Sequence, residues 1–154
     1  MNKNIKNTII KYKQKVKNGH DPSSNNNEDL IYACKVNNLK LVRLILKYKR
    51  TNPSANNNEA LILAIKKSNI SLVKFLLSDN RLIIPSNFYE AIGSACLEKN
   101  LEIIQLFLDD YRIKLTNKIY TIFPYINYDI KIKVLIDTEI RKNIISNLTD
   151  KVSS

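Results

Sequence analysis

The chain of 154 residues is poor in residues that carry chemistry or break regular structure: it has two glycines, four prolines, two cysteines, one histidine and no tryptophan. So little glycine and proline excludes a collagen-like or a low-complexity disordered chain. The sequence contains no glycine-rich phosphate loop, no paired-cysteine metal motif and no serine or cysteine with a plausible histidine partner. We therefore predict that the protein is not an enzyme and has no catalytic residue, cofactor, metal or small-molecule substrate.

Long hydrophobic runs are absent as well. No stretch approaches the ~18 apolar residues that a membrane span needs, and the first 17 residues carry lysines where a secretory signal would be apolar. The lone histidine, His20, lies in the turn-rich segment 18–22, with no other ligand at metal-binding spacing. We interpret it as a surface turn residue.

Acidic residues are missing from residues 1–20, which contain six lysines, whereas residues 84–113 have a net charge of −3. The formal net charge of +11 favours acidic partners. Four apolar residues near the start are spaced like one stripe of a helix: Ile5, Ile9, Tyr12 and Val16. We predict that residues 1–20 form a basic N-terminal capping helix and turn. Binding of this lysine-rich helix to nucleic acid or to a membrane surface is the open alternative.

A repeated pattern organises the middle of the chain. Ala33, Ala64 and Ala95 lie 31 residues apart. Two further sets have the same period: Asn38, Asn69 and Asn100, and Leu46, Leu77 and Leu108. A period of this length is typical of stacked supersecondary units that cannot bury their apolar faces alone. We predict three repeats, at residues 21–51, 52–83 and 84–113, and an all-α solenoid of stacked helix-turn-helix units with short connecting loops or hairpins.

Each repeat is expected to contain two helices. Three asparagines have capping-box spacing to a glutamate and should begin the first helix, namely Asn25, Asn56 and Asn87. Asn38, Asn69 and Asn100 should end it, because asparagine tolerates the left-handed conformation of a C-cap. The second helix is apolar nearly all round, so neighbouring repeats must cover it on both sides.

The register decays after residue 113. Thr116 and Asn117 are expected to begin a helix that Pro124 ends. Two further helices are predicted at residues 129–136 and 138–148. We interpret residues 114–149 as a degenerate fourth repeat with a C-terminal capping helix, and residues 150–154 as a frayed tail.

The two cysteines, Cys34 and Cys96, occupy equivalent positions in the first and third repeats. Stacked helices ~8–10 Å apart would separate them by roughly 20 Å, beyond the ~7 Å between Cα atoms that a disulfide allows. We predict two buried free thiols, which suit a reducing intracellular compartment such as the cytoplasm.

The segment NEALILAIKKSNISLVKFLL resembles the ankyrin repeat, with Leu-x-x-Ala in its first helix and Leu-Val-x-x-Leu-Leu in its second. The opening Asp-Pro-Ser-x-Asn-Asn-Asn is similar to divergent ankyrin arrays of giant viruses of amoebae and of amoebae themselves. Where the family has Thr-Pro-Leu-His, this chain has Glu-Asp-Leu-Ile and Glu-Ala-Leu-Ile, and its period is 31 rather than 33. Phe123-Pro124 and the residues after it resemble, faintly, the F-box-like tails of some viral ankyrin proteins.

The resemblance implies a non-catalytic protein–protein interaction module that binds through its loops and the exposed side of its first helices. The residues that this surface would contribute are Lys35, Lys49, Arg50, Lys66, Lys67, Arg81, Lys99, Tyr111 and Arg112. Most are cationic, so the expected protein partner has an acidic patch. Nucleic-acid binding through residues 1–20 is the competing hypothesis.

Overall fold

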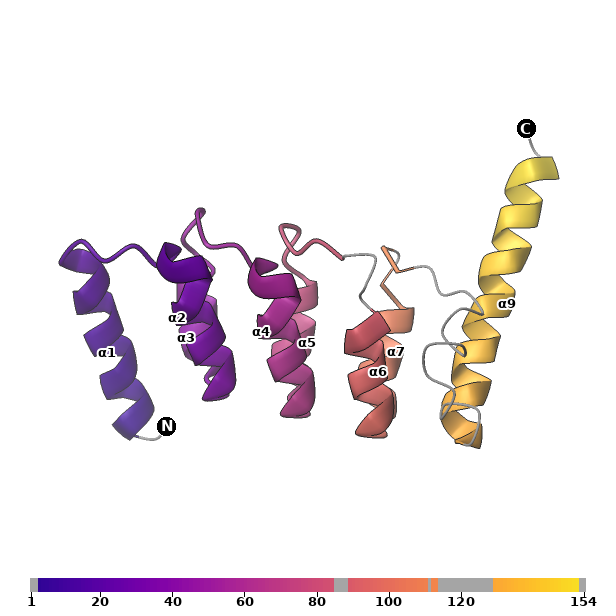
Figure 1. The fold of residues 1–154 in the computed structure, drawn as a ribbon, viewed down its shortest axis with the longest axis horizontal. Helices are drawn as coiled ribbons and strands as arrows, with labels where there is room; N and C mark the ends of the chain where they lie inside the picture. Colours follow the sequence, from indigo (N-terminus) through magenta and orange to yellow (C-terminus); the bar gives the residue numbers. More distant parts are fainter. Residues whose placement is uncertain (1–2, 85–88, 111, 114–128, 153–154) are drawn as a thin grey trace. The chain divides into compact units, whose positions relative to one another are not determined.

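The computed structural model describes residues 3–84, 89–110, 112–113 and 129–152, and these fall into two compact units, Met1–Ile83 and Ile84–Ser154. The division coincides with the predicted boundary between the second and third repeats. All regular structure in the described residues is helical, and each repeat contains a pair of helices (Figure 1). The predicted all-α class is therefore confirmed.

The described part of the first unit consists of helices α1 (Lys3–Lys17), α2 (Ser24–Lys35), α3 (Leu39–Ile45), α4 (Ala55–Lys66) and α5 (Ile70–Leu77). Helix α2 packs against α3 and α4, α4 packs against α5, and α1 contacts α3. The core consists of apolar residues that recur at the repeat period, chiefly Leu30, Ala33, Val42, Ile45, Leu61, Ala64, Val73 and Leu76. Tyr12, only 8% exposed, anchors α1 to this core.

Helices α2 and α4 each begin with a left-handed turn of three asparagines. Residues 25–27 have φ values of 49°, 54° and 63°, and residues 56–58 have φ values of 50°, 56° and 64°. Asparagine enters this region more readily than other non-glycine residues. The predicted cap is wrong, because the Asn25 amide donates to the Glu28 carboxylate at 3.5 Å and the chain is not yet helical there. Asn27 instead accepts a hydrogen bond from the Asn52 N–H at 2.6 Å, which links the two repeats.

The turn between the two helices of a repeat also differs from the prediction. The left-handed residue is Asn37, Ser68 or Lys99, one position earlier than expected. The N–H of the next asparagine bonds to the carbonyl of the repeat alanine, at 2.9 Å for Asn38 and 3.1 Å for Asn69. This is the Schellman arrangement, which satisfies the last carbonyls of the first helix. Asn38, Asn69 and Asn100 are therefore N-caps of the second helix: each side chain accepts the N–H three residues later at 3.0–3.1 Å.

The second unit contains α6 (Tyr89–Leu97), α7 (Leu101–Leu108) and α9 (Ile130–Val152) among its described residues. Helix α6 packs on α7, and α7 packs on α9. Helix α9 buries a stripe at a spacing of four residues, formed by Ile132, Ile136 and Ile140.

The two helices predicted within residues 129–148 are one helix. Nothing interrupts it, since the segment lacks glycine and proline, and the Thr138 hydroxyl donates to the Val134 carbonyl at 2.7 Å one turn earlier. The helix continues to Val152, so the predicted frayed tail begins inside it. The predicted cap at Asn87, the helix between Thr116 and Pro124 and the Phe123-Pro124 pair lie outside the described residues.

Candidate partner-binding surface

The helix pairs of the first unit have two ends with different side chains. Helices α2 and α4 begin beside the loops that follow α3 and α5, and run toward the short turns at the opposite end (Figure 1). Lys35, Lys66 and Lys67 lie at the turn end, whereas Arg50 and Arg81 lie in the loops. The eight residues from 28 to 35 alone span about 12 Å of helix. The predicted residues of this unit therefore form two groups.

The turn end presents exposed lysines on a firmly held backbone. Lys35, Lys66 and Lys67 are all exposed. The side chain of Asn69 donates to that of Asn37 at 2.5 Å, so the turns of the first two repeats are joined directly. These cations project from fixed positions, and little order has to be gained when a partner binds.

An exposed aromatic residue, Tyr32, lies three residues before Lys35 on α2 and was not predicted. Tyr32 is 56% exposed and Val36, one turn later, is 45% exposed. Tyr32 also lines a groove of about 280 Å³ together with Thr8, Lys11, Tyr12, Lys15, Asp29 and Leu41. Its position was visible in the sequence: a residue just before the inward-facing Ala33 and three before Lys35 points away from the core.

One carboxylate, that of Asp29, lines this groove. Its Oδ2 accepts the Tyr12 hydroxyl at 2.9 Å and pairs with His20 Nε2, and Lys15 Nζ lies 3.3 Å from Oδ1. Burial alone would raise the pKa of Asp29, but the bonds from His20, Tyr12 and Lys15 hold it below its ordinary value. Burial and the same bond raise the pKa of Tyr12. His20 is thus a part-buried residue that links the turn to α2 through Asp29, and it is not a simple surface residue.

At the loop end, Arg81 is engaged within its own chain. Asp79 holds the guanidinium, with Nε 2.9 Å from Oδ1 and Nη2 2.6 Å from Oδ2. Nη1 also donates to the carbonyls of Tyr48, Lys49 and Thr51, at 3.2, 3.3 and 3.1 Å. Nη2 donates to the carbonyl of Leu46 at 2.7 Å. The Arg81 hydrogen bonds hold the pKa of Asp79 below its ordinary value. Arg81 therefore fixes the loop that follows α3.

Arg50 and Lys49 occupy that fixed loop and are exposed. The side chain of Arg50 is 84% exposed, and Nη1 lies 3.5 Å from Asp21 Oδ2. A cavity of about 320 Å³ adjoins them, lined by Val16, Gly19, His20, Asp21, Pro22, Tyr48, Lys49 and Arg50. Two cations and one carboxylate thus face the same hollow.

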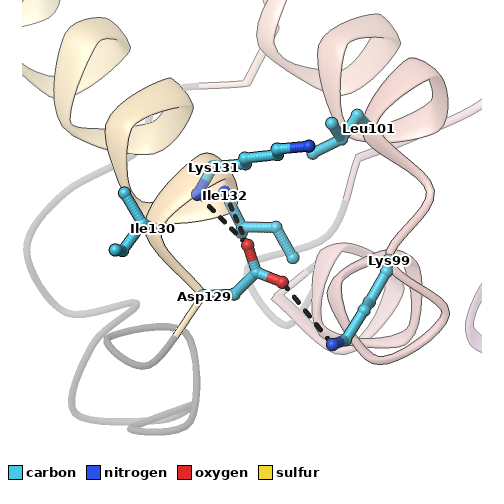
Figure 2. A pocket seen from close by; sticks show the side chains of 6 residues that line it. All are labelled: Lys99, Leu101, Asp129, Ile130, Lys131 and Ile132. Carbon is cyan, nitrogen blue, oxygen red and sulfur yellow. Dashed lines mark hydrogen bonds and ion pairs between the residues drawn. The ribbon is translucent and has the colours of Figure 1, made fainter.

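In the second unit, the predicted residues are largely paired. Lys99 lies 3.8 Å from the Asp129 carboxylate, which also caps α9 by accepting the N–H groups of Lys131 and Ile132 at 3.2 Å each (Figure 2). These residues line a hollow of about 460 Å³. Arg112 is held by Asp110, with Nη2 2.5 Å from Oδ2. Tyr111 lies outside the described residues.

A family model described as ankyrin repeats (3 copies) matches residues 2–87 and 30–119. The chain belongs to the ankyrin-repeat family. No curated protein and no solved structure gave a significant match. Ankyrin repeats are generally protein–protein interaction modules and are typically non-catalytic.

The ankyrin repeats of this chain contain two cysteines, Cys34 and Cys96, whose thiols are buried. Burial raises the pKa of the Cys34 thiol to about 12, and burial with Asp129 raises that of Cys96 to about 12, so neither thiol is a ready nucleophile. Both are free and buried, as predicted. The described residues contain no cluster of three side chains that could hold a metal ion, and none of their helices is long and apolar enough to cross a membrane.

Proposed function

We propose that the protein is a non-catalytic ankyrin-repeat module that binds a protein partner carrying acidic and apolar side chains. The exposed Tyr32 is the observation that carries the proposal, because tyrosine and arginine are among the residues that most often anchor an interface once a partner covers them. Its neighbours Val36 and Lys35 supply apolar area and charge on the same face of α2. The exposed Lys66 and Lys67 extend the positive region onto α4.

The partner is expected to place an apolar side chain against Tyr32 and Val36 and carboxylates beside the lysines. Exposed rim charges influence specificity and association rate more than total affinity. Tyr32 should therefore contribute most of the affinity, and the lysines most of the preference for acidic partners. The two free thiols suit a reducing compartment, which we propose as the place where the protein acts.

Affinity purification from the native cell, followed by mass spectrometry, tests this function. We expect specific partners of the wild type to be lost with Tyr32→Ala and with the combined Lys35→Glu, Lys66→Glu and Lys67→Glu variant. A matched variant, Lys40→Glu, Lys47→Glu and Lys74→Glu, makes the same charge change at exposed positions on α3, just after α3 and on α5, respectively. It should retain the partners. Equal losses in the two triple variants, or none in either, would refute the surface.

Nucleic acid is the second candidate, supported by five exposed lysines on α1: Lys6, Lys11, Lys13, Lys15 and Lys17. Their binding would be set by phosphate contacts and would weaken steeply with salt. Two results would favour nucleic acid over a protein partner. Nuclease treatment would remove the bound material from the wild-type sample, and a mobility shift seen at low salt would be abolished by Lys6→Glu with Lys13→Glu.

A further inference from the structure

We propose that Arg50 is the specificity-determining arginine of the loop end and that it binds a carboxylate side chain of the partner in the cavity beside Lys49. The inference rests on the proposed function, since it presumes a protein partner. It adds a second contact at the opposite end of the helix pair from Tyr32. The evidence is a comparison that the repeats themselves provide.

Arg50, Arg81 and Arg112 occupy the same position in three repeats, 31 residues apart. The guanidinium of Arg81 makes hydrogen bonds to one carboxylate and four carbonyls. Arg112 is likewise held by a carboxylate and is 20% exposed. Arg50 makes one contact, at 3.5 Å, within the described residues and is 84% exposed. The same residue type in the same register is therefore structural in two repeats and available in the first.

The cause is the residue two positions earlier. Repeats two and three have Asp79 and Asp110 there, and the first repeat has Tyr48. The backbone turn is the same in all three repeats, because each has the same hydrogen bond from an N–H to the carbonyl three residues earlier. The bonds are Thr51 to Tyr48 at 3.0 Å, Leu82 to Asp79 at 2.9 Å and Ile113 to Asp110 at 2.8 Å. Without a carboxylate at position 48, nothing folds the Arg50 side chain back against its own turn.

The cavity of about 320 Å³ beside Arg50 has the size and charge to receive one carboxylate. Asp21 contacts Nη1, so the edge formed by Nε and Nη2 has no hydrogen-bond partner among the described residues. A guanidinium edge matches a carboxylate with two parallel hydrogen bonds. Arg81 pins the loop carbonyls on either side of Arg50, those of Lys49 and Thr51, so the loop is already ordered.

The same geometry disfavours a phosphate. Asp21 is 43% exposed on the cavity wall, and its Oδ1 is occupied by Ser23. A phosphate ester on a side chain carries about −1.5 to −2 charge at neutral pH and would be repelled by Asp21 more strongly than a carboxylate would. His20, which lines the cavity together with Lys49 and Arg50, is bonded to Asp29 through Nε2. A glutamate or aspartate side chain of a peptide is the occupant that this balance favours.

The test uses the full chain and a fluorescent library of 12-residue peptides, each with one central glutamate near an aromatic residue, and matched peptides with glutamine instead. We expect wild type to bind selected glutamate peptides at least ~10-fold more tightly than their glutamine partners. Arg50→Ala should reduce that ratio to below about threefold. Lys47→Ala, an exposed lysine of the same segment, should leave it unchanged.

The substitution Tyr48→Asp makes the sharper experiment, because it installs the carboxylate that holds Arg81. It should reduce the glutamate preference as far as Arg50→Ala does, without lowering the thermal midpoint. The double variant Tyr48→Asp with Arg50→Ala separates capture of Arg50 from repulsion of the peptide by the new charge. If Tyr48→Asp acts by capturing Arg50, it has no further effect in the Arg50→Ala background.

The outcomes separate the two proposals. If Arg50→Ala leaves the glutamate preference within twofold of wild type while Tyr32→Ala abolishes peptide binding, the role of Arg50 is refuted and the proposed function stands. If wild type binds no glutamate peptide better than its glutamine partner, the carboxylate site is refuted. If an oligonucleotide displaces the peptides, and Arg50→Ala weakens the oligonucleotide more than the peptides, the site belongs to nucleic acid.

Discussion

At the scale of residues, the Asp79–Arg81 pair makes stability depend on pH. The Arg81 side-chain hydrogen bonds outweigh burial and hold the pKa of Asp79 below its ordinary value of about 3.9. Stability from such a group is fully present above the unfolded-state pKa and is lost as pH falls through the folded one. We predict that Asp79→Asn destabilises the protein by about 1–2 kcal/mol at pH 7, and that the difference from wild type shrinks below about pH 4. Urea unfolding of both proteins at pH 7 and pH 3 measures this difference in the free energy of unfolding.

A matched control for Asp79→Asn is Glu98→Gln. The Glu98 carboxylate is exposed and forms no hydrogen bond or ion pair with the described residues. Its removal should change the free energy of unfolding by less than ~0.5 kcal/mol at either pH. A destabilisation by Asp79→Asn that is equally large at pH 7 and pH 3 would mean that packing, and not the ionised carboxylate, is what was lost.

The sequence could predict which residues are buried in the repeats but not what the arginines do. Ala33 and Ala64 were expected to face inward from their spacing, and both are fully buried. Arg50 and Arg81 were expected to act alike, because charge and register are the same. Their roles differ partly because of the side chain two positions earlier, which is Tyr48 in one repeat and Asp79 in the other. In addition, Arg81 bonds to carbonyls about 30 residues earlier, and a residue pattern does not show that these groups lie close in space.

At the scale of elements, the turn between α4 and α5 can be tested at two adjacent positions. Ser68 has φ of +48°, a conformation that glycine adopts without steric cost. Asn69 caps α5 by accepting the Leu72 N–H at 3.0 Å. We predict that Ser68→Gly stabilises the protein by up to about 1 kcal/mol, and that Asn69→Ala destabilises it by about 1 kcal/mol. Chemical denaturation with paired variants measures both.

The two changes serve as controls for each other. If Asn69 were the left-handed residue, Asn69→Gly would stabilise and Ser68→Gly would destabilise through added backbone entropy. The opposite pattern is expected here. The homologous pair in the second unit, Lys99→Gly and Asn100→Ala, should repeat the signs, since Asn100 accepts the Ile103 N–H at 3.1 Å and Lys99 has φ of +51°.

Helix pairs could be predicted from the apolar period, but their ends could not. Asparagine suits both a C-cap and an N-cap, so its position between two helices left its role open until the backbone was seen. The left-handed residues Asn37, Ser68 and Lys99 share no side-chain type, because the Schellman turn is stabilised by backbone hydrogen bonds. Helix α9 was predicted as two helices for a related reason. An apolar stripe indicates which face of a helix is buried but not where the helix begins, and Thr138 was expected to begin a second helix although its hydroxyl bonds to the Val134 carbonyl within one helix.

At the scale of the molecule, charge is divided between the units in a way that the total conceals. Residues 1–83 contain 16 basic and 5 acidic residues, whereas residues 84–154 contain nine of each. The formal charge of +11 therefore belongs entirely to the first unit, which also carries Tyr32, Lys35 and Arg50. Residue 83 was predicted as the end of a repeat but not as a boundary between compact units, because the apolar pattern continues through Ile83 and Ile84 without a break in sequence.

This charge should act on the rate of association with an acidic partner. Salt shortens the Debye length from about 10 Å at 0.1 M to about 3 Å at 1 M, which screens long-range attraction and leaves contacts within a formed complex largely intact. We predict that raising NaCl over this range lowers the association rate constant for a glutamate peptide by about tenfold, with less than about a threefold change in the dissociation rate constant. Stopped-flow fluorescence measures both.

Lys6→Gln with Lys13→Gln removes two exposed charges of α1 that line neither the Tyr32 groove nor the Arg50 cavity. It should slow association without changing dissociation. A salt effect confined to the dissociation rate would show that attraction at a distance plays no part, and that the lysines of α1 act by direct contact instead.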